Sequence, residues 1–143
     1  MLLNVSYHNK ETIKKIDAKV GKPFTLWERW KMRGIGSPRL VLKSMSIQIS
    51  NLMELDSNRN VCNIEMRPDG IIIGFRSRLE VYALVIPYYK LVLFKGKSDE
   101  YTIHKNDYFF KIEARKKDTA VHRFMKKVME AKARALPEAP QLP

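Results

Sequence analysis

The stretch that decides the fold class is Arg67-Pro-Asp-Gly-Ile-Ile-Ile-Gly-Phe75. Proline pre-sets a turn and glycine takes the left-handed position, so residues 71–75 are predicted to return antiparallel to residues 61–66. Outward from this hairpin, short apolar-alternating segments continue in both directions between turn residues. In all we predict seven strands, at residues 45–52, 61–66, 71–75, 79–86, 88–94, 100–104 and 108–114.

Helical periodicity replaces this alternation towards the two ends of the chain. From Asp118 to about Ala135, apolar residues recur every three or four positions among basic ones, which predicts one amphipathic closing helix. Before the strands, residues 9–20 and 26–33 have the same period, and Thr25 with Glu28 forms a capping box. Strands followed by a single helix indicate a mostly β, α+β chain.

These periods divide the chain into three segments. Residues 1–44 form a basic helical N-terminal arm, residues 45–135 form a β-barrel domain with its C-terminal helix, and residues 136–143 form a Pro-rich flexible tail. Alternatively, Leu40 to Lys43 adds a strand and the arm completes the sheet. A single cysteine suits a reducing compartment, and no segment has signal-peptide or membrane-spanning character, so we expect a cytoplasmic protein.

The positive charge is concentrated at the two ends of the chain. The formal net charge is +12, yet residues 46–100 carry seven basic and seven acidic side chains. Residues 1–45 have ten Lys and Arg against three acids, and residues 101–143 have ten against five. A field of this sign attracts anionic lipid, acidic protein surfaces or nucleic acid phosphates. The ends are therefore expected to bind the partner.

Two local patterns connect this order of elements with a known superfold. The hairpin at Arg67 is similar to the turn into strand three of pleckstrin-homology domains, and Val85-Ile-Pro-Tyr-Tyr-Lys-Leu91 is similar to the start of strand five in bacterial members. Over residues 45–135 the chain resembles this PH-like superfold, which implies a seven-stranded antiparallel barrel or sandwich whose open corner is plugged by one C-terminal helix. The resemblance also implies phosphoinositide binding by basic residues near the first strand turn, but only Arg59 and the more distant Arg67 are basic there.

A tryptophan pair among cations is the main candidate for a partner-binding site. Trp27 and Trp30 lie three residues apart in the predicted helix 26–33. Tryptophan beside cations suits a membrane interface, base stacking or a protein hot spot. The interpretation we prefer is that both rings pack the helix onto the strands, as aromatics at this spacing usually do. The partner-binding candidates are Trp27, Arg29, Trp30, Lys31, Arg33, Arg39 and Lys43 in the arm and Arg123, Lys126 and Lys127 on the closing helix, where a solvated helix face is the alternative.

No catalytic, cofactor-binding or metal-binding pattern stands out in the sequence. The three histidines, His8, His104 and His122, have no acid or cysteine at ligand spacing, and no nucleophile or carboxylate pair can be nominated. We expect a non-enzymatic adaptor that binds an anionic membrane surface peripherally or an acidic protein, with no cofactor and no small-molecule substrate. The alternative is a nucleic-acid-associated or assembly protein whose basic arm inserts into a larger complex. Self-association through an edge strand is a further expectation.

Overall fold

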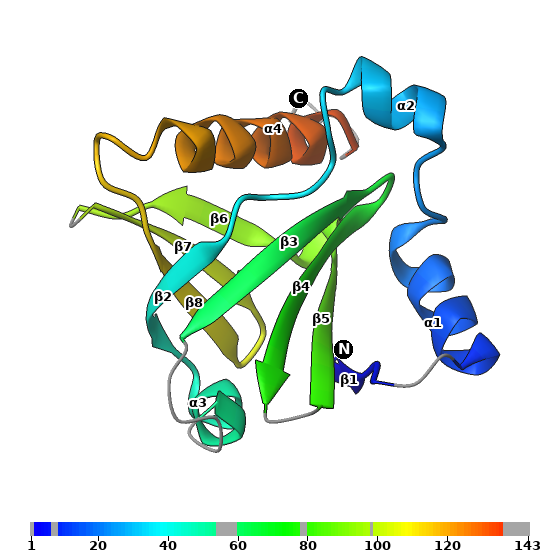
Figure 1. Ribbon diagram of the computed structural model, residues 1–143, viewed down its shortest axis with the longest axis horizontal. Coiled ribbons are helices and arrows are strands. Elements are labelled where there is room, and N and C mark those ends of the chain that lie inside the picture. The colour runs from blue at the N-terminus through cyan, green and yellow to red at the C-terminus, as the bar shows by residue number, and fades with distance from the viewer. Residues whose placement is uncertain (1, 7–8, 54–59, 78–79, 98, 136–143) are drawn as a thin grey trace, which may run out of the picture.

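The fold is one bent antiparallel sheet with helices at its ends and on one side (Figure 1). The computed structural model describes residues 2–6, 9–53, 60–77, 80–97 and 99–135, so the predicted tail at 136–143 lies outside the described residues. The eight described strands follow the order β1-β5-β4-β3-β2-β8-β7-β6, and the sheet does not close because β1 and β6 each have one neighbour. The strands are β1 (Leu2–Asn4), β2 (Leu40–Met45), β3 (Val61–Arg67), β4 (Gly70–Ser77), β5 (Glu80–Pro87), β6 (Val92–Lys95), β7 (Glu100–Lys105) and β8 (Tyr108–Glu113).

Four α-helices and one short 3₁₀ helix accompany the sheet in the described part of the chain. They are α1 (Lys10–Val20), α2 (Leu26–Lys31), α3 (Ile47–Met53), the 3₁₀ helix η1 (Tyr88–Lys90) and α4 (Thr119–Ala135). The prediction of a mostly β, α+β chain with a C-terminal helix is confirmed, although the described residues form eight strands rather than seven. The predicted fifth strand begins later, at Val92, because η1 follows Pro87.

The predicted strand at residues 45–52 is wrong, because α3 occupies most of that stretch. The Ser46 carbonyl accepts the N–H groups of Ile49 at 3.1 Å and Ser50 at 2.9 Å, which starts the helix. Ile47 is exposed and Ile49 is buried. Residues two apart lie on opposite sides of a helix but on the same side of a strand, so their alternation in the sequence was misleading. Two observed strands were not among the seven predicted: β1, and β2, which contains the segment Leu40 to Lys43.

β2 joins the two halves of the sheet. Its first residues pair with β3, as Leu40 does with Cys62, and its later residues pair with β8, as Leu42 does with Ile112. The register shifts between Leu42 and Ser44, and a bulge of this kind bends a strand. Strands β3 to β5 and β6 to β8 therefore face each other across one interior (Figure 1). The predicted boundary after residue 44 falls inside this strand.

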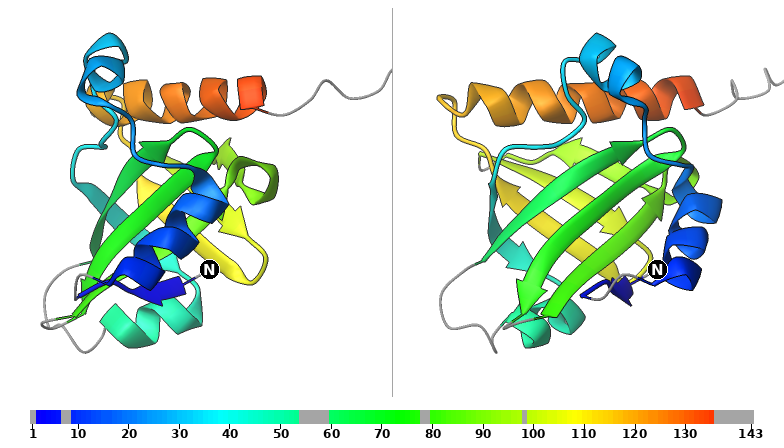
Figure 2. Two further views of the ribbon diagram at one scale, coloured as in Figure 1. Left: turned by 90° about the vertical axis from the view of Figure 1, so that its right-hand side faces the viewer. Right: turned by 45° about the vertical axis from the view of Figure 1, so that its right-hand side comes forward.

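One core fills the space between the two halves and beneath α4 (Figure 2). Ile64 and Ile73 contribute from one half, and Ile103 and Phe110 contribute from the other. α4 is amphipathic as predicted, and its buried face, which includes Phe124, covers one open end of the bent sheet. The closing helix therefore completes the core rather than standing apart from it.

α1 covers the outer face of β4 and β5. Its residues Ile16 and Val20 are buried with Val85, and Ile72 packs against the same cluster. The neighbours of Ile72 and Val85 along each strand face the main core instead. The unbroken apolar runs in β4 and β5 are explained by this arrangement, because both faces of these strands are covered.

The hairpin between β3 and β4 is present, but its glycine has a different role from the predicted one. Arg67 pairs with Gly70 across a two-residue turn. The described glycines with positive φ are Gly21 and Gly34, so Gly70 is not left-handed. A Cβ at Gly70 would lie 2.3 Å from the Ile86 carbonyl oxygen and 2.5 Å from Val20 Cγ1. Gly70 is therefore required by the close approach of β5 and α1.

Replacing Gly70 with alanine should lower the free energy of unfolding by roughly 3 kcal/mol, because the new methyl group overlaps backbone atoms. Gly36→Ala is the matched control, since a Cβ there has no atom within 4 Å and should change the unfolding free energy by less than about 0.5 kcal/mol. Urea unfolding of both variants gives the comparison. Equal stability of the two variants would contradict this role for Gly70.

Lys105 crosses the interior from the end of β7 to β5. The residue is only 7% exposed, and its Nζ donates a hydrogen bond to the Val85 carbonyl at 3.1 Å. It makes no ion pair within the described part of the chain. Burial lowers the pKa of Lys105 below its ordinary value. This residue links the two halves of the sheet on the side where the sheet is not closed.

The lowered pKa makes one contribution to stability depend on pH. The folded state releases the Lys105 proton at a lower pH than the unfolded state, so stability rises with pH up to the ordinary lysine pKa of 10.5. The unfolding free energy of the wild type minus that of Lys105→Met should therefore grow as the pH rises towards the ordinary lysine pKa. Burial raises the pKa of both Cys62 and Tyr88 to about 12, and their effects cancel in this difference. A constant difference in urea titrations would contradict the prediction.

Candidate functional site

α2 is stabilised by contacts at its ends. Thr25 and Glu28 form the predicted capping box, in which the Glu28 amide donates to Thr25 Oγ1 at 3.2 Å and the Thr25 amide donates to Glu28 Oε1 at 3.1 Å. Gly34, with a φ of 98°, follows the helix and donates its N–H to the Arg29 carbonyl at 2.9 Å. None of the six residues of α2 is buried. The sequence therefore forms a helix here without packing its side chains into the core.

Three large apolar side chains of α2 face solvent. Leu26 is 82% exposed, Trp27 is 61% exposed and Trp30 is 72% exposed. The two indole rings stack with centroids 5.4 Å apart, and Lys31 Nζ lies 5.2 Å from the centroid of the Trp27 ring, a cation–π contact. The interpretation that the tryptophans pack α2 onto the strands is therefore wrong. We call Leu26, Trp27, Trp30, Lys31 and Arg33 the tryptophan cap.

Leu26 was not among the candidates from the sequence. Its position four residues before Trp30 is the signal that could have included it, because residues four apart share one face of a helix. The segment is too short for its pattern to indicate whether that face is buried or exposed. Contacts outside α2 hold the helix in the position that leaves this face exposed.

Contacts before and after α2 fix the position of the tryptophan cap. Arg29 Nε donates to the Phe24 carbonyl at 3.1 Å, and both Phe24 and Met32 pack against the core. From α4, Lys127 Nζ donates to the Arg33 carbonyl at 3.2 Å. Arg29 and Lys127, two of the partner-binding candidates, thus help to hold the helix in place. The cap is attached to the sheet on one side and to α4 on the other.

The structure brings the candidates on α4 next to the cap. α2 lies alongside α4 in both views of Figure 2. Arg123 and Lys126 are exposed on α4, and Arg123 lies one turn before Lys127 on the same face. Arg39 comes just before β2 and Lys43 lies within it, on the strand that leads away from α4 towards α3 (Figure 1). The two basic regions of the sequence therefore meet at one end of the molecule, with Arg39 and Lys43 on its side.

Arg67, one of the two basic residues near the lipid site that the resemblance implies, has a structural role. Its Nη1 donates to Asp17 Oδ1 at 3.1 Å and to the Gly21 carbonyl at 2.9 Å. Its Nε forms a hydrogen-bonded ion pair with Glu65. These contacts neutralise the guanidinium and fasten the end of α1 to β3. Arg59, the other basic residue, lies outside the described residues.

The described residues include neither a membrane-spanning helix nor a cluster of metal ligands. No helix among them is both long and apolar enough to cross a bilayer, and no group of three or more of their His, Cys, Asp or Glu side chains could hold a metal ion.

Comparison with protein-family models, with curated proteins and with solved structures finds no significant match to the chain. Function is therefore inferred from the surface of the molecule itself.

Lys127→Met should loosen α2 while leaving the core in place. The variant keeps the apolar part of the side chain and loses the donor to the Arg33 and Gly34 carbonyls, a contact to a charged group worth on the order of 1.5 kcal/mol. Amide hydrogen exchange in residues 29–34 should become roughly tenfold faster. Lys126→Met, which removes the exposed cation beside it, is the control. The same exchange rate in both variants would show that Lys127 does not hold α2.

Proposed function

We propose that this protein is a non-enzymatic adaptor module that attaches peripherally to an anionic membrane surface through the tryptophan cap and the exposed cations of α4. The observation that carries the proposal is the exposure of Leu26, Trp27 and Trp30 on a helix whose position is fixed at both ends. An indole ring suits the membrane interface, where its apolar body meets the acyl chains and its N–H remains near the polar headgroups. Apolar side chains beside cations are typical of interfacial helices.

The cations around the cap supply the second part of the attraction. Lys31 and Arg33 are exposed within the cap, and Arg123 and Lys126 are exposed on the neighbouring α4. Each Lys or Arg close to an anionic lipid surface contributes about 1 kcal/mol, and this attraction decays over a Debye length of about 10 Å at 0.1 M salt. Apolar insertion and electrostatic attraction together give reversible attachment stronger than either alone.

A membrane explains the exposed apolar groups better than the other anionic partners. An acidic protein or a nucleic acid would be attracted by the same cations, but each would leave Leu26 and the two indole rings in water unless it offered a matching pocket. A fluid interface accommodates a protruding helix without such a pocket. α2 protrudes at the top of the molecule (Figure 1), so it can reach a flat surface first.

The architecture supports a PH-like assignment as part of the same proposal. The sheet bends at β2, and the amphipathic α4 covers one open end, which is the arrangement that the resemblance implies. A rigid sheet attached by one end would leave its other faces for additional partners, as an adaptor requires. The cytoplasmic leaflet, with its anionic lipids, would supply the complementary charge.

Intrinsic fluorescence tests the membrane proposal directly, because both tryptophans of the chain belong to the cap. Emission should shift to shorter wavelength on vesicles that contain phosphatidylserine and stay unchanged on pure phosphatidylcholine vesicles, and the shift should weaken as salt rises. In cosedimentation, Trp27→Ala/Trp30→Ala should lower vesicle affinity at least about tenfold. Ile47→Ala, which removes a 71% exposed apolar side chain from α3 at the opposite end of the molecule, is the control.

A pair of charge variants separates local from overall electrostatics. Lys31→Gln/Arg33→Gln removes two charges from the cap, and Lys14→Gln/Lys15→Gln removes two exposed charges from α1. Only the first pair should weaken binding to phosphatidylserine vesicles by about tenfold or more. Equal losses in the two variants, or vesicle binding without a fluorescence shift, would contradict attachment through the cap.

A further inference from the structure

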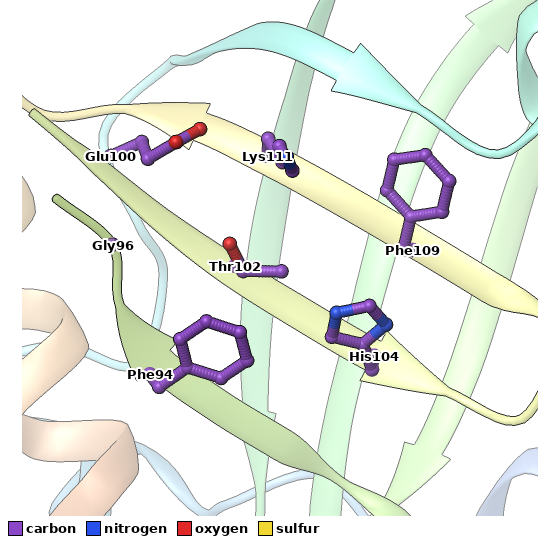
Figure 3. A pocket seen from close by; sticks show the side chains of 7 residues that line it. All are labelled: Phe94, Gly96, Glu100, Thr102, His104, Phe109 and Lys111. Atoms are coloured by element: carbon purple, nitrogen blue, oxygen red, sulfur yellow. The ribbon is translucent and has the colours of Figure 1, made fainter. Parts of the chain in front are cut away.

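Three aromatic rings lie in a row on the outer face of β6, β7 and β8 (Figure 3). The ring centroids of Phe94 and His104 are 5.8 Å apart with planes inclined by 16°, and those of His104 and Phe109 are 6.0 Å apart with planes inclined by 37°. The view onto this face shows the three rings beside one another, each from a different strand. They therefore lie side by side over the sheet, with Phe94 exposed and His104 and Phe109 partly buried. We call these three residues the ring platform.

Strand alternation and register together produce the ring platform. In β7, Tyr101 and Ile103 point into the core, so His104 is on the other face. The register places His104 directly opposite Phe109, while Phe94 lies diagonally across from His104 on β6. α1 covers the outer face of β4 and β5, but in the described part of the chain no helix covers this one, and Phe94 remains 46% exposed.

The surroundings of the ring platform are polar and more basic than acidic. The rings line an open hollow of about 410 Å³, together with Gly96, Glu100, Thr102 and Lys111. Lys97 is exposed directly after Gly96, beyond the end of β6. Glu113, the next outward residue on β8, forms an ion pair with Arg115 Nε at 2.9 Å. Glu100 is the one acid among the seven lining residues.

We propose that the ring platform binds unpaired bases of a single-stranded nucleic acid. Every base has a flat π-face, and stacking on exposed aromatic rings is the general way in which proteins hold single strands with little sequence preference. Lys111 lines the hollow beside the rings and Lys97 follows Gly96 at its rim, so both are placed to meet the phosphates of a strand crossing the platform. The surface is separate from the tryptophan cap, since it is formed by the sheet rather than by the arm or α4.

The shape of the face favours bases over a peptide. A peptide groove needs walls that enclose alternate side chains, whereas this hollow is open and its floor is formed by rings lying flat. The Thr102 side chain lies on the same face but is only 3% exposed, so the rings rather than a hydroxyl form the contact surface. Flat aromatic area and nearby ammonium groups match two parts of a nucleotide, the base and the phosphate.

Anisotropy titrations with a short labelled oligouridine and the full chain test the ring platform. Phe94→Leu/Phe109→Leu keeps apolar bulk and removes the aromatic faces, and it should weaken binding at least about tenfold. Tyr89→Leu, which removes a 67% exposed ring outside the platform, is the matched control and should leave the affinity unchanged. Thermal unfolding of each variant checks that the fold is intact, and the single variant Phe94→Leu provides a milder second test.

Two further probes separate stacking from charge. An abasic oligonucleotide of the same length keeps the phosphates and lacks the bases, so it should bind at least about tenfold more weakly than oligouridine. Trp27→Ala/Trp30→Ala should retain oligouridine affinity, which distinguishes this surface from the tryptophan cap. Equal binding of abasic and normal strands, unchanged affinity in the leucine variants, or binding of an acidic peptide at the platform in preference to oligouridine would overturn the proposal.

Discussion

The bend in β2 is the constraint on which the remaining structure depends. Leu40 and Leu42 are buried on a strand that pairs first with β3 and then with β8, and the register shift before Ser44 lets it turn from one half of the sheet to the other. Without this shift, the apolar faces of both halves would lie on one open surface in water. With it they enclose a single core, and the opening that remains is filled by α4 through Phe124 and Met125.

The same bend decides which surfaces are covered. α1 places Ile16 and Val20 over the outside of β4 and β5, and α4 takes the open end, but α2 buries none of its residues. The outer face of β6 to β8 likewise has no covering helix within the described residues. Both proposed binding surfaces lie where the covering elements stop, and each combines fully or partly exposed rings with nearby lysines.

Turn residues, cap residues and a long helical period predicted more of this structure than a short apolar alternation did. The hairpin at Arg67 and the capping box depend on specific neighbouring residues, the closing helix depends on a long helical period, and all three are present. α3 was missed because Ile47 and Ile49 alternate as in a strand, although one is exposed and the other buried. The exposure of the tryptophan cap depends on Lys127, 94 residues away from Arg33 in the sequence, and no local pattern contains that contact. The ring platform needs the register of three strands, which the sequence left open.

The contacts that hold α2 in place make its exposed side chains suitable for binding. A six-residue helix is too short to be stable alone, so its geometry comes from the caps and from the contacts to Phe24 and α4. Because these contacts order Trp27 and Trp30 before any encounter, less conformational entropy is lost when they bind. Lys127 also joins the cap to the helix that carries Arg123 and Lys126, so apolar insertion and electrostatic attraction act through one rigid end of the molecule. The free energies of insertion and of electrostatic attraction then add in one binding event, because neither group of side chains must first be ordered separately.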